Sequence, residues 1–298
     1  MLFRGTATAL VTPFKKDGSV DEATLRDLVE IQIRAKVEAL VPVGSTGEAA
    51  TLSDAEQGEV IESVVDQTNG RIPVIAGASS NSTSKAIALA RQAKKFGADA
   101  ILTVAPYYNK PTQEGMYQHF SAIADAVEMP MVLYNVPGRT ASNIEASTVL
   151  KLAEEIPFIA GVKEASANFS QIMEILHHRP KEFGVWSGDD NLTLPLVALG
   201  ADGVVSVVSN EAPKLFAEMV RLALKGKFEK AREAHYVLLH LMNANFVETN
   251  PTPVKAAMAM MGLLEETYRL PLIALSDGLR PKIEKALKEV GLLSRPKS

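Results

Sequence analysis

Short apolar runs rich in β-branched residues alternate with longer segments of helical spacing over the first two-thirds of the chain. Each run ends at turn-favouring residues such as Gly, Pro, Ser, Thr or Asn. Runs of this length, bounded in this way, are typical of β-strands. The pattern therefore predicts eight strands, over residues 6–11, 39–43, 72–76, 100–104, 131–134, 159–163, 183–187 and 203–207.

The segments between these runs carry helical signals. Over residues 85–96, apolar side chains recur at i, i+3, i+4 and i+7 and share one face: Ala86, Leu89, Ala90 and Ala93. Gly97 follows as the predicted C′ residue. Ser53 and Glu56 have the spacing of a capping box and open the helix after the second strand.

The predicted strands are apolar throughout rather than alternating, which is the pattern of a parallel sheet covered on both faces by helices. Eight β/α units favour a closed (β/α)8 barrel, the TIM barrel. An open doubly wound sheet remains an alternative. Its usual G-x-G-x-x-G fingerprint and the G-x-x-x-x-G-K-[ST] phosphate loop are both absent from the chain.

Strand signals stop near Lys225, and the rest of the chain has helical spacing. Helices are predicted over residues 228–246, 254–262 and 283–290, the second of them opened by Pro253. We therefore expect a catalytic barrel over residues 1–225 and a C-terminal helical domain over residues 226–298. This helical domain should pack against the barrel or against a neighbouring subunit.

Composition narrows the classes of function. The 298 residues include 31 basic and 35 acidic side chains, a formal net charge of −4. Such a charge does not attract nucleic acid or anionic membranes, and no stretch approaches the roughly 18 apolar residues of a membrane span. We expect a cytoplasmic protein that acts on small molecules. Cysteine is absent, which excludes disulfides, thiolate metal sites and cysteine nucleophiles.

In a TIM barrel the chemistry lies at the C-terminal ends of the strands, and Lys163 ends the sixth predicted strand. An isolated lysine is normally a solvated surface charge. A lysine that an apolar strand delivers to the barrel mouth is desolvated, which favours the neutral, nucleophilic amine. Such an amine condenses with a ketone to give a Schiff base, whose iminium lets the neighbouring carbon lose a proton.

The fifth strand leads to two more candidates, Tyr134 and Arg139. Tyr134 is either a core tyrosine whose hydroxyl finds a partner or a proton shuttle close to Lys163. Arg139 is either a charge on the rim or a guanidinium that grips a substrate carboxylate with two hydrogen bonds.

Two loops supply further hydroxyl groups. Residues 44–48, with the sequence GSTGE, follow the second strand and precede a helix. Their backbone N–H groups could hold a carboxylate while the Ser45 hydroxyl relays protons, although such residues also make ordinary turns. The fourth strand runs into residues 106–111, where Tyr108 is a candidate third hydroxyl for the relay. The two tyrosines of this segment could instead pack a loop or a subunit contact.

Other polar residues constrain the reaction. A metal-dependent aldolase needs histidine ligands at strand ends, whereas all five histidines fall on predicted helices: His119, His177, His178, His235 and His240. We therefore expect no metal and no cofactor. Asp189 and Asp190 follow the seventh strand, where we favour a cap of the next helix over a catalytic carboxylate pair.

Three motifs in chain order carry a resemblance to a known family. They are residues 44–48, residues 134–140 (YNVPGRT) and residues 161–165 (GVKEA), after the second, fifth and sixth strands. Together they resemble the pyruvate-dependent class I aldolase superfamily of dihydrodipicolinate synthase and N-acetylneuraminate lyase, over essentially the full length. Within it, residues 106–111 (PYYNKP) and Arg139 resemble the dihydrodipicolinate synthase (4-hydroxy-tetrahydrodipicolinate synthase) family.

This resemblance implies condensation of pyruvate with aspartate-4-semialdehyde through a lysine Schiff base, on the route to diaminopimelate and lysine. It implies that Lys163 forms the Schiff base and that three hydroxyl groups relay protons: Tyr134, Ser45 and Tyr108. Tyr108 would enter from the neighbouring subunit of a tight dimer, usually doubled into a homotetramer. Ser45 stands where threonine is commoner and keeps the hydroxyl.

The same resemblance implies the substrate contacts. Pyruvate would be held by Thr46 and by the backbone at Val205, with Gly188 lining the pocket. Arg139 would bind the carboxylate of the semialdehyde.

In lysine-inhibited members, an allosteric site at the dimer interface uses imidazoles and a carboxylate to bind the effector. The matching positions in this sequence are Ala50, Asp54, Gln57, Asn81, Lys85 and Tyr107. Lys85 puts a cation where an anion should receive lysine, and like charges weaken binding. We therefore predict weak or absent inhibition by lysine.

Two other functions stay open. Another aldolase on this scaffold, such as N-acetylneuraminate lyase or a 2-keto-3-deoxy-sugar acid aldolase, would share Lys163 and Tyr134 but accept a longer substrate. Arg139 argues against it, because a polyol chain needs hydroxyl partners rather than a guanidinium. A non-catalytic ligand-binding protein could also have kept the barrel, since fold does not fix function.

Overall fold

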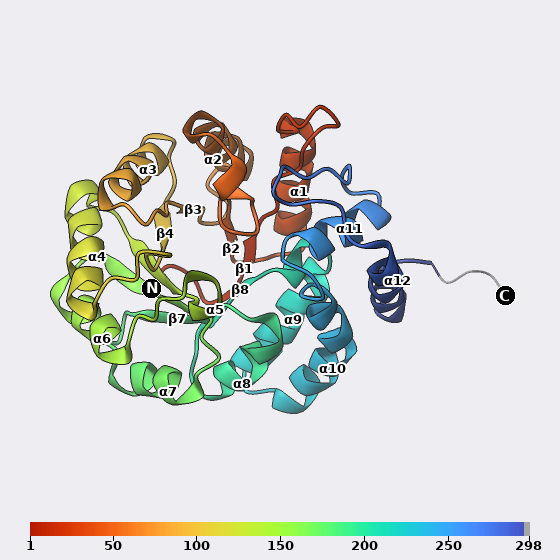
Figure 1. Cartoon of the computed structure of the whole chain (residues 1–298). Helices are drawn as coiled ribbons and strands as arrows, with labels where there is room; N and C mark the ends of the chain where they lie inside the picture. Colours follow the sequence, from red (N-terminus) through yellow and green to blue (C-terminus); the bar gives the residue numbers. More distant parts are fainter. Residues whose placement is uncertain (295–298) are drawn as a thin grey trace.

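Eight parallel strands form one sheet that closes into a barrel (Figure 1). The computed structural model describes residues 1–294. In the sheet the strand order is β2-β1-β8-β7-β6-β5-β4-β3. A parallel bridge between Leu40 and Val74 joins the two ends of this order, β2 and β3. The predicted TIM barrel is confirmed. The strands are β1 (Gly5–Ala9), β2 (Ala39–Val41), β3 (Ile75–Gly77), β4 (Ala100–Val104), β5 (Met131–Asn135), β6 (Ile159–Glu164), β7 (Gly184–Ser187) and β8 (Gly203–Ser206).

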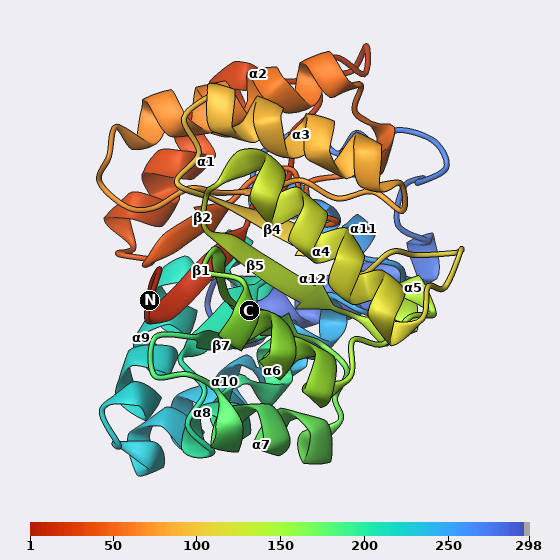
Figure 2. The same cartoon turned by 90° about the vertical axis from the view of Figure 1, so that its left-hand side faces the viewer.

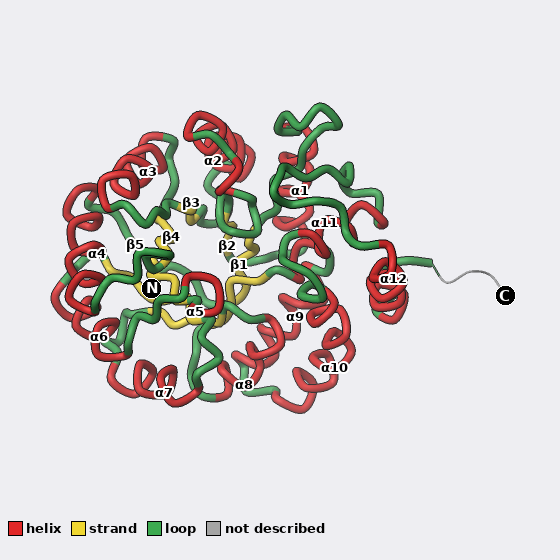
Figure 3. The backbone as a smooth tube through the Cα atoms, viewed as in Figure 1, coloured by secondary structure: helices red, strands yellow, loops and turns green. Residues whose placement is uncertain are grey.

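Helices connect the strands and cover the outside of the barrel, as parallel neighbours require (Figures 1 and 3). Figure 2 shows α2, α3 and α4 side by side on this outer layer. The helices up to the end of the barrel are α1 (Glu22–Arg34), α2 (Asp54–Thr68), α3 (Thr83–Lys95), α4 (Gln113–Val127), α5 (Pro137–Thr140), α6 (Ala146–Glu155), α7 (Phe169–His178), α8 (Thr193–Ala198) and α9 (Pro213–Leu224). Short 3-10 turns are η1 (Ala49–Thr51), η2 (Asp190–Leu192), η3 (Val208–Asn210) and η4 (Asp277–Leu279).

The local signals for helices are confirmed. The four apolar residues of the predicted face on α3 are all buried. Gly97 has a φ of +84° and follows the C-cap residue Phe96. Ser53 and Glu56 form the expected capping box, in which each side chain accepts a hydrogen bond from the backbone N–H of the other residue.

An aromatic stack closes the amino-terminal end of the barrel. Phe3 precedes β1, and its ring lies 4.6 Å from the Trp186 ring, with an angle of 11° between the two planes. Trp186 is fully buried. Gly161 on β6 leaves room for it, because a Cβ atom at Gly161 would lie 2.5 Å from the Trp186 ring. Phe3 and Trp186 thus fill this end of the barrel, and in TIM barrels the chemistry lies at the opposite end, where the strands have their carboxyl ends.

The chain ends in α10 (Phe228–Ala244), α11 (Thr252–Met260) and α12 (Arg280–Glu289), which lie on one side of the barrel (Figure 1). The predicted helical C-terminal region is confirmed. Leu241 on α10 shares a hydrophobic cluster with Val204 on β8. Met258 on α11 shares another with Val11 and Leu28 near the start of the barrel. Within residues 1–294, no helix is long and apolar enough to span a membrane.

Candidate active site

Lys163 and Tyr134 lie side by side inside the barrel, near the carboxyl ends of β6 and β5. The two residues are in register across this parallel strand pair, so their side chains point to the same face of the sheet. Lys163 is 6% exposed and Tyr134 is 8% exposed. The Lys163 Nζ atom lies 4.1 Å from the centroid of the Tyr134 ring. The neighbourhood predicted from strand order is therefore confirmed as geometry.

Burial changes the acid–base properties of both groups. It lowers the pKa of Lys163 to about 8, because the ammonium loses its solvation, while the carboxylates of Asp189 and Asp190 oppose this shift. Burial raises the pKa of Tyr134 to about 12. The site thus pairs an amine that is partly neutral near pH 8 with a phenol that keeps its proton and can donate it.

Gly188 provides the space around the lysine. It follows β7, and its N–H donates to the Glu164 carbonyl at 2.8 Å. A Cβ atom at Gly188 would lie 2.5 Å from Cβ of Ala165 and 3.1 Å from Cε of Lys163. The structure therefore brings Gly188 against the lysine. Val205 lies in the same interior cluster as Tyr134.

The turn at residues 44–48 lies at the end of β2, and its two hydroxyl groups differ in setting. Ser45 is exposed, whereas Thr46 is buried. Thr46 Oγ1 accepts a hydrogen bond of 2.9 Å from Nδ2 of Asn250, a residue that precedes α11. Because this bond uses the oxygen as an acceptor, the Thr46 proton is free to be donated to a bound anion.

Asn250 also reaches the second strand-end loop. Its backbone carbonyl accepts a hydrogen bond of 3.3 Å from NH2 of Arg139 on α5. Arg139 is otherwise exposed at the mouth. Asn250 thus joins Thr46 to Arg139, although the sequence analysis did not single it out. Its only sequence signal is an Asn-Pro pair between two predicted helices.

Tyr108 does not join these groups within the chain. Its side chain is 88% exposed and makes no hydrogen bond to the described residues, and its φ is +72°. The expected relay of Tyr134, Ser45 and Tyr108 is therefore not assembled within one copy of the chain.

The expectation that Asp189 and Asp190 cap a helix is wrong. Asp189 occupies the N-cap position of η2, but its side chain makes no capping bond. The Ser187 hydroxyl fixes this turn instead, by accepting from the Asp189 N–H and donating to the Asp189 carbonyl. The Asp190 carboxylate accepts from the N–H groups of Val207 and Val208, beyond β8. The Asp189 carboxylate is left near the active site, where it acts on the pKa of both Lys163 and Tyr134.

The positions matched to the allosteric site lie around the start of α2 and of α3. Lys85 Nζ lies 3.5 Å from Oδ1 of Asp54, so the cation is paired with the one carboxylate of the set. Gln57 is buried and donates to the Ala49 carbonyl at 3.0 Å. Ala50 and Tyr107 are exposed, and Asn81 is half-buried.

The histidines lie where the sequence predicts them. His119 is on α4, His177 and His178 are on α7, and His235 and His240 are on α10. None of these five side chains is on a strand end.

Comparison with known proteins identifies the family. Residues 2–290 match the model of the dihydrodipicolinate synthetase family. A 4-hydroxy-tetrahydrodipicolinate synthase of Koribacter versatilis is 55% identical over 294 residues, which is 98% of each chain.

Solved structures agree with this match. One is a chloride-inhibited dihydrodipicolinate synthase of Acinetobacter baumannii complexed with pyruvate; it is 45% identical, with a TM-score of 0.95 over 97% of this chain and 99% of that one. Another is the enzyme of Cyanidioschyzon merolae with lysine bound; it is 41% identical, with a TM-score of 0.96 over 98% of this chain and 99% of that one. The matches confirm the expected enzyme class, an aldolase-type lyase of lysine biosynthesis, and the chain belongs to the dihydrodipicolinate synthetase family.

Proposed function

We propose that the protein condenses pyruvate with aspartate-4-semialdehyde through a Schiff base on Lys163. The observation that carries this proposal is the buried pair of Lys163 and Tyr134 at the ends of adjacent strands. The lowered pKa of Lys163 supports it, because the neutral amine is the nucleophile. The named relatives and the pyruvate complex of one of them point to the same reaction.

In this mechanism, the Lys163 amine attacks the C2 carbonyl of pyruvate. Loss of water gives an iminium, and loss of a proton from C3 gives an enamine. The enamine carbon then bonds to the aldehyde carbon of the second substrate, whose oxygen takes up a proton, and the iminium re-forms. The amino group of that substrate attacks the iminium carbon and releases the Lys163 amine. The Tyr134 hydroxyl keeps its proton at neutral pH and is suited to donate it as water leaves and to recover it afterwards. Ser45 and Tyr108 would extend this proton path.

Substrate binding follows from the surrounding groups. The Thr46 hydroxyl, whose oxygen accepts from Asn250, would donate its proton to pyruvate. The backbone at Val205 would also hold pyruvate. The absence of a side chain at Gly188 leaves space beside Lys163 for the ketone. Arg139, exposed at the mouth, would bind the carboxylate of the semialdehyde, which distinguishes this reaction from cleavage of a longer sugar acid.

Borohydride reduction in the presence of pyruvate tests the proposal. The expected result is a covalent adduct whose mass maps to Lys163, with none in Lys163→Arg, which keeps the charge but lacks a nucleophilic amine. Absence of the adduct in the parent protein would refute the Schiff-base mechanism. In a separate reaction without borohydride, addition of aspartate-4-semialdehyde should cause the parent protein to consume pyruvate.

Arg139→Ala separates this synthase from related aldolases. The variant should still form the pyruvate adduct but lose at least about 100-fold in condensation rate, because the second substrate is no longer oriented. An undiminished condensation rate would refute the proposed role of Arg139 in binding the semialdehyde.

We further propose that lysine inhibits the enzyme weakly or not at all. The Lys85 ammonium is paired with Asp54. An incoming lysine would have to displace this partner and approach a like charge.

We also propose a homotetramer built from two tight dimers. The exposed Tyr108 supports the dimer, because a hydroxyl of the proposed relay that meets no other relay group among residues 1–294 of its own chain needs a second copy to reach them. Analytical ultracentrifugation of the parent protein tests the assembly.

A further inference from the structure

A fully buried ion pair links the C-terminal helices to the turn at residues 44–48. Lys255 Nζ on α11 lies 2.5 Å from Oε1 of Glu48, and both side chains are 0% exposed. Lys255 Nζ also donates to the Thr12 carbonyl at 3.1 Å. The ammonium lies 4.3 Å from the Phe14 ring centroid and 5.1 Å from that of Tyr268, so aromatic rings surround it.

The backbone of the turn is in an unfavourable conformation at the residue that forms the pair. Glu48 has a φ of +56°, in the left-handed region that a residue with a long side chain seldom adopts. Such a conformation persists only where the surroundings fix it. The preceding residue, Gly47, is also held in place, because its carbonyl accepts a 2.7 Å hydrogen bond from the Thr12 hydroxyl. The end of the turn is therefore bonded both to the loop that follows β1 and to α11.

Two contacts from one segment reach this turn. Lys255 binds Glu48, and Asn250, five positions earlier, binds the Thr46 hydroxyl. Glu48 and Thr46 are themselves two positions apart. Residues 250–255 thus contact the turn at two points. One is the charge pair at Glu48, and the other is the Thr46 hydroxyl, which faces pyruvate in the proposed function.

A buried ion pair is a weak device for stability, because desolvation of two charges offsets their attraction, and apolar residues of similar volume often serve as well. Its directional contacts do fix geometry. We propose that Lys255 and Glu48 are positioning residues, which hold the 44–48 turn so that Thr46 binds the carboxylate of pyruvate. This inference rests on the proposed function.

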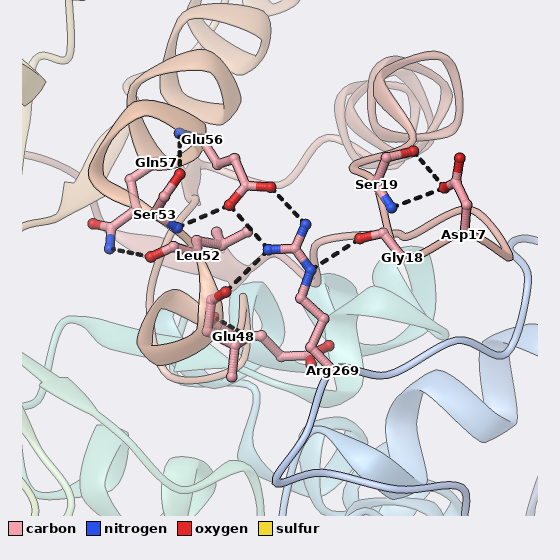
Figure 4. Close-up of polar contacts among 10 residues, drawn as sticks. Asp17, Gly18, Ser19, Glu48, Leu52, Ser53, Glu56, Gln57 and Arg269 are labelled. Carbon is pink, nitrogen blue, oxygen red and sulfur yellow. Dashed lines mark hydrogen bonds and ion pairs between the residues drawn. The ribbon is translucent and has the colours of Figure 1, made fainter.

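A second link between the C-terminal region and the barrel provides a control. The Arg269 guanidinium forms two hydrogen bonds to Glu56 on α2, of 2.6 and 3.0 Å, and others to the Gly18 and Thr51 carbonyls (Figure 4). Arg269 makes no hydrogen bond to residues 44–48. Its guanidinium faces the same Phe14 ring as Lys255, with Cζ 4.5 Å from the ring centroid. Arg269→Gln therefore removes a charged contact close to the pair but removes no hydrogen bond of residues 44–48.

The test measures how the adduct on Lys163 depends on pyruvate concentration, by borohydride trapping, together with KM for each substrate and kcat. Lys255→Met should raise the half-saturating pyruvate concentration and its KM by about tenfold or more, because a small displacement of a binding group has a large effect. KM for the semialdehyde should stay within about twofold of the parent value. The double variant Lys255→Met with Glu48→Gln should show the same defect. It leaves no unpaired buried charge, but it still lacks the contact that holds the turn.

Arg269→Gln should lower the midpoint of thermal unfolding and leave the KM for pyruvate within about twofold. The inference is overturned if Lys255→Met is folded and keeps the pyruvate KM of the parent, or if Arg269→Gln shows the same rise in KM. If Lys255→Met does not fold at the assay temperature, Glu48→Asp decides, since it keeps both charges and withdraws the carboxylate by one methylene. No adduct in the parent protein would refute the proposed function itself, whereas an adduct with unchanged pyruvate dependence in the variants refutes only the positioning role.

Discussion

At the scale of single residues, opposing influences set the reactivity of Lys163. Burial is the largest influence and lowers its pKa, and the charge of Arg139 acts in the same direction. The carboxylates of Asp189 and Asp190 raise the pKa and so limit the shift. With a pKa of about 8, Lys163 is neutral in roughly half of the molecules at pH 8. Well below pH 8, the neutral fraction falls about tenfold for each pH unit.

The rate of adduct formation with pyruvate should therefore rise with pH and level off above about 8. Asp189→Asn removes one of the charges that favour the ammonium, so the midpoint of this profile should move to lower pH. Rates of borohydride-trapped adduct formation between pH 6 and pH 10, at saturating pyruvate, give both midpoints. A midpoint that stays in place or moves upward would contradict the proposed influence of Asp189 on the lysine.

Gly188→Ala tests the space beside the lysine. The added methyl group would contact Ala165 and the Lys163 side chain at distances that require one of them to move. We expect adduct formation to fall by about 100-fold, while far-UV circular dichroism stays that of the parent. Gly278→Ala is the matched control, because a Cβ atom there meets no other atom within 4 Å. Equal rates in the two variants would show that the pocket tolerates a side chain at Gly188.

Sequence pattern was sufficient to find Lys163 and Tyr134, because each ends a strand and strand ends meet at the barrel mouth. It was not sufficient for Asn250, whose contact with Thr46 spans 204 positions. The cap expected at Asp189 failed for a local reason. The Ser187 hydroxyl already serves both backbone groups of Asp189, which leaves the carboxylate free to face the site.

At the scale of elements, all eight strands were predicted, and several of their ends differ by one to three residues from the prediction. Proline accounts for two of these differences. The strand expected over residues 39–43 ends at Val41, because Pro42 has no N–H to donate to a neighbour. The strand expected from residue 72 begins only at Ile75, beyond Pro73. Proline therefore limits the pairing of two strands whose apolar runs are longer.

The first turns of α2 and α3, which hold Asp54 and Lys85, carry the prediction on regulation. Lysine at millimolar concentration should leave the activity of the parent enzyme almost unchanged. Lys85→Glu replaces the repelling charge by an attracting one and should lower the half-inhibitory lysine concentration by about tenfold. Lys214→Glu on α9 is a control with the same change in net charge, at an exposed position. Strong inhibition of the parent at sub-millimolar lysine would show that the Lys85–Asp54 pair does not block the effector.

At the scale of the whole molecule, the C-terminal region is more than a cover. It shares hydrophobic clusters with β8 and with the start of the barrel. A chain that ends at Lys225 would leave the hydrophobic clusters that contain Val204 and Val11 without the side chains that α10 and α11 contribute to them. We expect this truncated chain to be insoluble or to lack a cooperative thermal transition, as judged by circular dichroism and calorimetry. A truncated barrel that unfolds cooperatively would show instead that the two parts are independent domains.

The sequence predicts this division near residue 225 from the loss of strand signals, yet it gave no sign that the helical part enters the site. Helical periodicity shows which face of a helix is apolar, but not where a polar residue such as Lys255 finds its partner. Glu48 lies 207 positions away from it. Contacts of this kind depend on the closed barrel and become visible only once it is built.

The aromatic stack at the base of the barrel has a practical consequence. Trp186 is the single tryptophan of the chain. It pairs in register with Lys163 across β6 and β7, so the indole and the Lys163 amine project from neighbouring positions. All tryptophan emission therefore comes from one fully buried ring below the active site. Native fluorescence, without any label, thus reports on the barrel interior that holds the lysine.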